Sequence, residues 1–261
     1  MYSGPRCPAR RVQGNALPTM YTSKQKLRPR SAARPDLPAV RFAIVGNMRT
    51  GSSHLGSLLD SHPDIACWNN EPFYDRGAYY ESGYGSPSEF LLSEVFNVGT
   101  RAVGFKLLWD AMAIVPSVWE LLSELRIRAV HTWRRNRLDS FLSLQLARAG
   151  NAFTCHDGNY PSAPIYIDPD QCFQWCVDSE MHDCEIERMA KLFAVPRIEV
   201  EYSQLRSDSV GVLDFLGLPQ QSLTSAMRKQ RTGHQSELIR NYADLKRTFA
   251  GTRWQGMFVD S

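Results

Sequence analysis

A glycine-bounded loop over residues 46–53 is the part of the sequence whose residue types best suit the binding of an anion. It reads Gly-Asn-Met-Arg-Thr-Gly-Ser-Ser and follows a short apolar segment over residues 41–45. Glycines let the backbone turn tightly, so that backbone N–H groups and the start of a following helix point at a phosphate or sulfate. Arg49 adds a cation to the loop. The pattern alone is equally typical of a tight strand-to-helix turn without a ligand.

The loop differs in two respects from that of nucleoside triphosphatases. Ser52 stands at the position after Gly51 where those enzymes carry a lysine. Arg134 and Arg135, rather than a carboxylate that could hold magnesium, follow the apolar segment 127–133. The sequence therefore predicts a nucleotide held by cations and backbone amides, without a metal ion. A P-loop kinase-like phosphotransferase that uses ATP and magnesium is the alternative.

A second candidate anion site is formed by Arg135 and Ser143. The guanidinium would stand at the end of a strand, and the hydroxyl two turns into the following helix. Such a pair can hold a further phosphate, with the arginine as the charge-assisted donor and the serine as a shorter one. Two separated anion sites predict a ligand that is charged at two places. Without the upstream loop, solvated arginines after a strand would be the simpler interpretation.

The spacing of apolar residues predicts the elements that position these side chains. Alternating strands and helices of ordinary length indicate an α/β fold with a parallel sheet covered on both faces. The sequence predicts strands over residues 41–45, 102–107, 127–133 and 197–202, and helices over 52–61, 114–125, 137–149, 169–193 and 209–216. Tyr-, Gly- and Pro-containing segments over 72–88 and 150–168 interrupt the alternation. Long loops of this kind are either lids over a substrate or mobile insertions.

Length and charge indicate one catalytic domain over residues 41–261 and a disordered basic tail over residues 1–40. The tail carries eight Lys and Arg against Asp36, so a net charge of +3 for the whole chain leaves −4 for the remaining 221 residues. We therefore expect no nucleic-acid partner. The tail could also be a transit peptide, or translation could begin at Met20.

Hydropathy and cysteine usage bear on the compartment. No stretch reaches the roughly 18 apolar residues that a membrane-spanning helix needs, and the first residues lack the apolar core of a secretory signal, so we expect a soluble protein. Six cysteines without a CxxC pair favour free thiols in a reducing compartment, which we expect to be the cytoplasm. Cys172, Cys176, His182 and Cys184 lie close in sequence. A helix with buried thiols is the expected reason, with a metal site as the alternative.

Together, the motifs resemble those of the sulfotransferases that use 3′-phosphoadenosine 5′-phosphosulfate (PAPS). Residues 49–53, Arg-Thr-Gly-Ser-Ser, are similar to the family's 5′-phosphosulfate loop, and Arg135 with Ser143 keeps the spacing of its 3′-phosphate motif. Residues 200–205 are similar to the strand whose tyrosine, here Tyr202, lies near the adenine. The resemblance covers most of residues 41–252 and implies a three-layer P-loop-like fold.

The end of the chain is more similar to bacterial members than to the cytosolic enzymes of animals. Two departures from the animal pattern matter. Leu108 stands where those enzymes have a catalytic histidine, and Arg49 replaces the loop lysine. Both are similar to the carbohydrate, protein-tyrosine and bacterial glycolipid branches, in which a glutamate in a segment like 70–73, Asn-Glu-Pro-Phe, is the proposed base. The resemblance therefore implies that Glu71 is the base, although it could also be an ordinary carboxylate paired with a cation.

The resemblance also assigns roles to the other candidate residues. Arg49 and the backbone amides of residues 50–53 would stabilise the leaving phosphate, and Lys106 would assist at the sulfonyl oxygens. Lys229 and Arg231 would close over the 3′-phosphate, or be solvated. The residues expected to bind PAPS are Arg49, Thr50, Gly51, Ser52, Ser53, His54, Arg135, Ser143, Tyr202, Lys229 and Arg231.

The implied reaction moves a sulfonyl group from PAPS to a hydroxyl, giving a sulfate ester and 3′,5′-bisphosphoadenosine. The acceptor would be a glycan, a glycolipid or a small metabolite, and the family also allows a homodimer. A non-catalytic domain that binds a sulfated or phosphorylated ligand is the rival from another class of protein.

Overall fold

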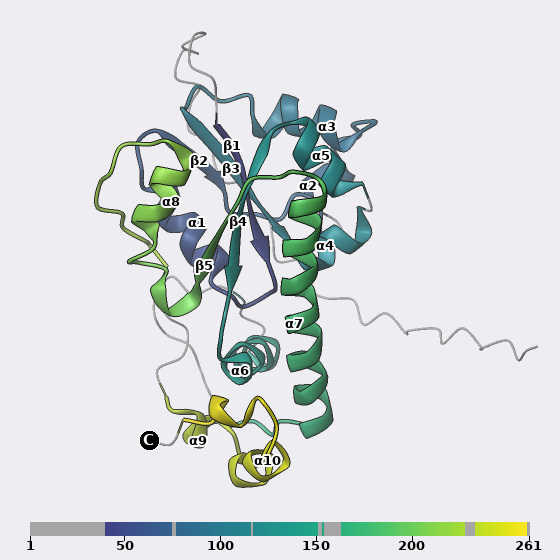
Figure 1. Cartoon of the computed structure of the whole chain (residues 1–261), viewed down its shortest axis with the longest axis vertical. Helices are drawn as coiled ribbons and strands as arrows, with labels where there is room; N and C mark the ends of the chain where they lie inside the picture. The colour runs from purple at the N-terminus through teal and green to yellow at the C-terminus, as the bar shows by residue number, and fades with distance from the viewer. Residues whose placement is uncertain are drawn as a thin grey trace, which may run out of the picture.

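Five strands form one parallel sheet in the computed structural model, which describes residues 40–74, 77–115, 117–150, 153, 163–227 and 233–259 (Figure 1). Within these residues the strand order is β2-β3-β1-β4-β5. The strands are β1 (Val40–Gly46), β2 (Ile65–Trp68), β3 (Ala102–Leu108), β4 (Ile127–Trp133) and β5 (Arg197–Glu201). The connection from β3 to β4 crosses β1, which leaves β1 at the centre with its carboxyl end beside those of β3 and β4.

Helices cover both faces of this sheet and also pack beyond the carboxyl ends of its strands. They are α1 (Ser52–Asp60), α2 (Ala78–Ser82), α3 (Pro87–Phe90), α4 (Trp109–Ile114), α5 (Val118–Glu124), α6 (Arg137–Ala149), α7 (Pro169–Leu192), α8 (Ser209–Leu216), α9 (Gln235–Leu238) and α10 (Tyr242–Thr248). A π-helical turn spans Leu91–Val95, and 3-10 turns span Tyr202–Gln204 and Gln255–Met257. In Figure 1, α1 and α8 lie on one side of the sheet, and α4, α5 and α7 lie on the other.

The alternating residues of β1 explain the three layers. Phe42 and Ile44 belong to a core shared with α1 and α8, whereas Ala43 and Val45 belong to a core shared with α5 and α7. All four are fully buried, as expected for a central parallel strand with both faces covered. Burial of both faces therefore requires the nearly continuous apolar run that the sequence has here.

A third apolar core lies beyond the carboxyl ends of the strands. It joins α6, the first half of α7 and the C-terminal segment, with Phe141, Cys172, Phe249 and Trp254 among its buried residues. In Figure 1 the C-terminal helices α9 and α10 lie beside α6 at this end of the molecule. The edge of the sheet that carries the glycine loop is therefore bounded by packed helices.

The predicted fold class is confirmed, and several elements have the predicted bounds. The strand over 127–133 and the helices over 137–149 and 209–216 agree residue by residue. The predicted helix over 114–125 is confirmed only over Val118–Glu124, which is α5, because α4 ends at Ile114 and a break separates the two helices. Val115 has φ −111° and ψ 84°, outside the helical region, as is usual for a residue before proline. Segment 72–88 also contains helix α2, which was not predicted.

The cysteines of α7 belong to the core. Cys172 and Cys176 are buried, and Cys184 is exposed. Nowhere in the described part of the chain do three or more His, Cys, Asp or Glu side chains gather in a way that could hold a metal ion. The expectation of a helix with buried thiols therefore agrees with the structure at Cys172 and Cys176.

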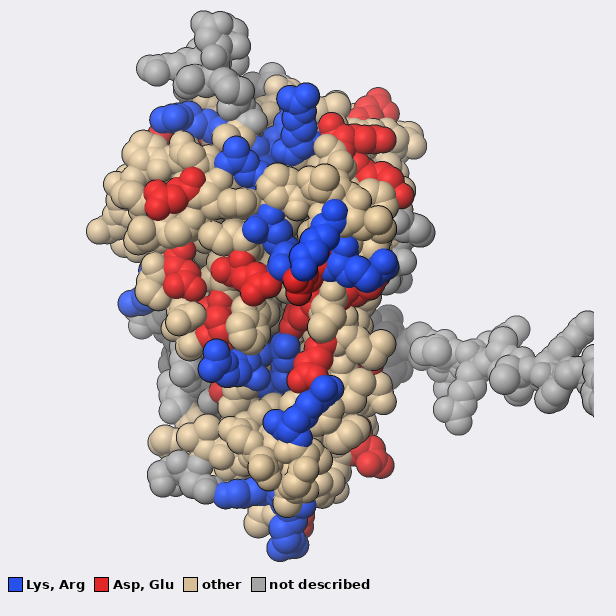
Figure 2. Space-filling model, viewed as in Figure 1, with Lys and Arg blue, Asp and Glu red and all other residues tan. Residues whose placement is uncertain are grey.

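The surface over the sheet and α7 carries charges of both signs. Figure 2 shows Lys and Arg beside Asp and Glu across the middle of the viewed face. Arg197, for example, ion-pairs with Glu199 at 2.5 Å and lies 3.8 Å from Glu187. None of the helices in the described part of the chain has the length and apolar character needed to cross a membrane. The predicted basic tail lies outside the described residues, apart from Val40.

Candidate active site

The loop between β1 and α1 turns tightly at its glycines, as predicted, and Arg49 also has a left-handed backbone. Gly46, Arg49 and Gly51 have φ values of 148°, 64° and 89°. A Cβ at Gly46 would lie 2.2 Å from the carbonyl oxygen of Thr132, so the loop leaves β1 in close contact with β4. Helix α1 begins directly after Gly51, and no side chain of the described residues caps it. Its first N–H groups are therefore suited to an anionic ligand.

Gly51 is required by both its conformation and its surroundings. An added Cβ would lie 2.4 Å from Leu205 Cδ1 and 2.9 Å from Tyr202 Cδ2. We expect Gly51→Ala to lower the free energy of unfolding by about 1 to 3 kcal/mol through overpacking, in addition to about 1 kcal/mol of left-handed strain. Denaturant unfolding measures the loss.

Gly217→Ala is the matched control for this prediction. Gly217 also has a left-handed φ, 69°, but an added Cβ there would meet nothing within 4 Å. The free energy of unfolding of Gly217→Ala should therefore fall only by the left-handed strain, about 1 kcal/mol. Equal losses in the two variants would contradict the close packing of the loop against Tyr202 and Leu205.

The threonine and first serine of the loop face inward. The hydroxyl of Thr50 donates to the carbonyl oxygen of Asn47 at 2.8 Å and lies 2.9 Å from the hydroxyl of Thr132. Thr50 and Ser52 are both buried. The side chain of Thr50 therefore holds the loop together, and its backbone N–H is the group left for a ligand. His54, half-buried in the first turn of α1, has its pKa lowered by burial and by the charge of Arg206.

Ser53, Lys106 and Glu71 meet at the carboxyl end of the sheet. The ammonium of Lys106 donates to Ser53 Oγ at 2.8 Å and to Glu71 Oε1 at 3.2 Å. The Lys106 side chain is 8% exposed and the Glu71 side chain 24% exposed, so the carboxylate is the more accessible of the two. The cation that pairs with Glu71 is thus itself a predicted site residue. Three elements that are distant in sequence supply this cluster.

The predicted 5′ and 3′ anion sites are joined by Arg49. Its guanidinium donates from Nε and Nη2 to Ser143 Oγ, at 3.0 and 2.9 Å, and from Nη1 to the carbonyl oxygen of Phe153 at 2.9 Å. Arg135 is exposed, and its Cζ lies 6.0 Å from the centroid of the Trp133 ring. Among the described residues the structure thus brings Arg49, rather than Arg135, to the hydroxyl of Ser143.

Tyr202, which the resemblance assigns to the neighbourhood of the adenine, stands beside the loop. Its ring packs against Gly51, and the guanidinium carbon of Arg134 lies 4.0 Å from the ring centroid. Arg134 is buried and pairs with Asp139 at 2.9 Å. The sequence patterns gave Arg134 no role, and the aromatic partner that holds it comes from a distant strand end. Lys229 and Arg231 lie outside the described residues.

Comparison with known proteins places these features in context. No protein-family model matches the chain. Nodulation protein H of Rhizobium meliloti is 26% identical over 246 residues, which cover 85% of this chain and 96% of that protein, and the protein of strain 1021 matches to the same extent. A crystal structure of a sulfotransferase from Alicyclobacillus acidocaldarius matches with a TM-score of 0.47 and 17% identity, over 82% of this chain and 92% of that one.

Nodulation protein H thus matches this chain over nearly the whole length of that protein. Residues 49–53, Arg135 and Ser143 carry the resemblance found in the sequence. In the structure, all of these residues lie at or beyond the carboxyl edge of the sheet, where open α/β sheets bind their ligands.

Proposed function

We propose that this chain is a sulfotransferase that moves the sulfonyl group of PAPS to a hydroxyl acceptor. The products would be a sulfate ester and 3′,5′-bisphosphoadenosine. The observation that carries the proposal is the cluster of Ser53, Lys106 and Glu71 beside a glycine loop, in which one ammonium contacts both a loop hydroxyl and a carboxylate. This arrangement places a proton acceptor and a cation next to an anion-binding backbone.

The donor would span the loop and the start of α6. The backbone N–H groups of residues 50–53 and the guanidinium of Arg49 suit the phosphosulfate, because they combine an uncapped helix start with a cation. Ser143 and the exposed guanidinium of Arg135 suit the 3′-phosphate. Tyr202, packed against Gly51, would lie near the adenine of the donor. His54 would line the same side of the loop.

Catalysis would rest on positioning and on electrostatic stabilisation of the transferring group. Glu71 would accept the proton of the acceptor hydroxyl as the new O–S bond forms. The bond from sulfur to the bridging oxygen of the phosphate would break at the same time. Lys106, buried where the dielectric is low, would stabilise the charge that develops on the sulfonyl oxygens and the bridging oxygen. Arg49 would stabilise the leaving phosphate.

The acceptor class we propose is the hydroxyl of a glycan or glycolipid, with a small metabolite second. A phosphotransferase that uses ATP and magnesium remains the competing class of enzyme, because it shares the strand-loop-helix arrangement. The position that would need a lysine in such an enzyme holds the buried Ser52. That position therefore favours the sulfonyl donor.

Thermal shift with three ligands separates these possibilities. We expect PAPS and bisphosphoadenosine to stabilise the chain without magnesium, by about 2.7 kcal/mol at a ligand concentration of 100 times Kd. ATP with magnesium should shift the melting temperature far less. A shift that requires ATP and magnesium would instead indicate a phosphotransferase, and donor binding without turnover on any hydroxyl acceptor would indicate a binding domain.

A further inference from the structure

A buried polar cluster on the α7 side of the sheet involves residues that the proposed mechanism does not use. The carboxylate of Asp183 accepts from Asn47 Nδ2 at 3.0 Å, from Arg137 Nη2 at 2.5 Å and from His131 Nε2 at 3.2 Å. Asn47, His131 and Arg137 are all buried. These four residues come from the loop, from β4, from α6 and from α7, so one carboxylate joins four separate segments.

The amide of Asn47 is held entirely by α7. Its Nδ2 donates to the Asp183 carboxylate and also to the carbonyl oxygen of Ser179 at 3.2 Å. Both partners are acceptors only, so the orientation of the amide is determined. Its oxygen therefore accepts from Nδ1 of His182 at 2.8 Å, and the His182 ring stacks on Trp109 with ring centroids 4.2 Å apart.

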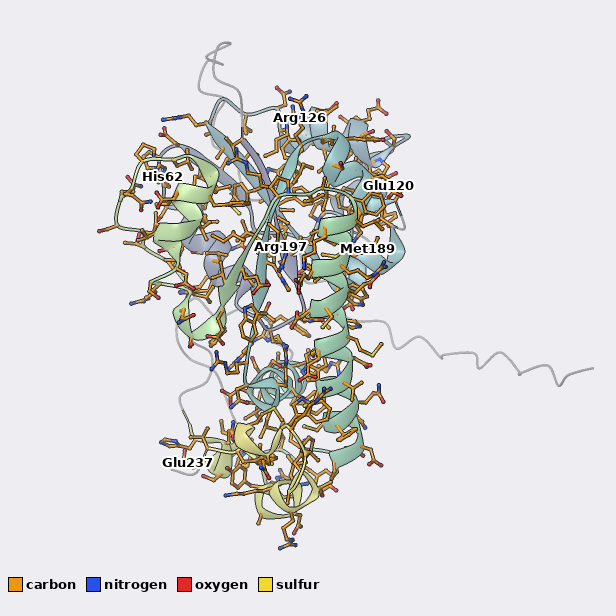
Figure 3. All side chains as sticks on the ribbon, viewed as in Figure 1. His62, Glu120, Arg126, Met189, Arg197 and Glu237 are labelled. Atoms are coloured by element: carbon orange, nitrogen blue, oxygen red, sulfur yellow. The ribbon has the colours of Figure 1, made fainter. Side chains whose placement is uncertain are left out.

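The orientation of His131 is determined in the same way. Arg197 donates to its Nδ1 at 3.0 Å, so the proton of the neutral ring is on Nε2, which donates to Asp183. Figure 3 labels Arg197 where β5 passes beside α7. Arg137 and His131 therefore both donate to Asp183, and its charge is compensated inside the protein. An uncompensated charge at this depth would be costly.

These contacts connect the two halves of the proposed donor site. Asn47 directly follows Gly46 and lies two residues before Arg49, so its amide sets where the loop leaves β1. Arg137 is the first residue of α6, the helix that carries Ser143. Asp183 holds both of them. Together with the Arg49–Ser143 hydrogen bonds and the pairing of Gly46 with Thr132, this carboxylate therefore sets the separation between the loop and the start of α6.

We propose that Asp183 is a positioning residue that holds the 5′ and 3′ phosphate subsites at the separation the donor needs. It acts through Asn47 and Arg137 and does not itself touch the donor. The inference rests on the proposed function, because it needs one ligand that occupies both subsites. Such a ligand gains affinity from its second phosphate only if the two subsites are held at the right separation.

Asp183→Asn tests this role with two ligands, each measured by calorimetric or NMR titration. The amide oxygen of the variant can still accept from Asn47, but its NH2 group cannot pair with the buried Arg137. We expect the affinity for 3′,5′-bisphosphoadenosine to fall by about tenfold or more. The affinity for adenosine 5′-monophosphate, which uses only the loop, should change by less than about threefold.

Two further variants keep the test decisive. Arg137→Lys retains the charge but shortens the reach to Asp183, and we expect a smaller loss in the same direction if Asp183→Asn does not fold. Glu185→Gln is the matched control, because this α7 carboxylate pairs with Arg188 at the surface and should leave both affinities unchanged.

The possible outcomes are distinct. A general loss of structure would lower the affinities for both ligands together, so equal losses, or no loss, would overturn the positioning role. A wild-type chain that does not bind bisphosphoadenosine at all would contradict the proposed function, and this inference with it.

Discussion

Glu71→Gln is expected to abolish sulfonyl transfer while leaving donor binding nearly unchanged. The glutamine has the shape of the glutamate and its oxygen can still accept from Lys106, which contacts Glu71 Oε1 at 3.2 Å in the native chain. It cannot take a proton from the acceptor hydroxyl. Loss of a general base typically lowers the rate by about 10² to 10⁴-fold. Release of bisphosphoadenosine from PAPS with a panel of sugar and phenol acceptors measures turnover.

The affinity for bisphosphoadenosine, measured by calorimetry, completes this experiment. This affinity should stay close to the wild-type value. The carboxylate of Glu71 is negative, so replacing it removes no attraction for the anionic donor. Glu120→Gln is the control, since Glu120 is exposed on α5 (labelled in Figure 3). Turnover that survives in Glu71→Gln would remove the base assignment and leave Glu71 as the ion-pair partner of Lys106.

Arg135→Ala is expected to weaken donor binding strongly. The guanidinium of Arg135 is exposed, and its backbone N–H is fixed by the carboxylate of Glu201 at 3.1 Å. A ligand phosphate can therefore reach it without breaking an internal ion pair among the described residues. Truncating an arginine paired with a phosphate costs about 2 to 5 kcal/mol, and partial exposure favours the lower end, near thirtyfold in Kd.

A comparison of two ligands makes this prediction specific. Arg135→Ala should weaken binding of bisphosphoadenosine but not of adenosine 5′-monophosphate, which lacks the 3′-phosphate. Arg188→Ala, at an exposed arginine of α7 paired with Glu185, should change neither affinity. Equal affinity of wild type and Arg135→Ala for bisphosphoadenosine would show that the 3′ subsite lies elsewhere, with Ser143 and Arg49 as the groups to test next.

Local sequence patterns predicted the elements that flank the loop. The apolar run before Gly46 and the helical spacing after Gly51 depend on neighbouring residues, so they indicate β1, the turn and α1 without further information. The same holds for β4 and α6, whose periodicity is clear. Strand β2 was not predicted, because it has only four residues, Ile-Ala-Cys-Trp, and its pairing with β3 is needed to stabilise it.

For the candidate site, too, the sequence identified residues, and the structure was needed to show their contacts. Arg49, Arg135 and Ser143 were identified from residue type and spacing, and Glu71 and Lys106 from the family resemblance. The sequence alone could not show that Lys106 contacts both Ser53 and Glu71, 53 and 35 residues away, or that Arg49 contacts Ser143, 94 residues away. Such contacts require the strand order of the sheet, which depends on how all the apolar faces are buried together.

The sequence by itself thus determined the glycine loop, the α/β class and the chemical types available at the candidate site. The tertiary structure alone decided how these groups are arranged, and this is clearest at Asp183. Nothing in the pattern of α7 distinguishes this residue from its other acidic residues, yet it lies 136 residues from Asn47 and contacts it directly. The Asp183 side chain is only 14% exposed, so its charge must be compensated by donors. Which donors reach it depends on the packing of α7 against the sheet, and not on any spacing along the chain.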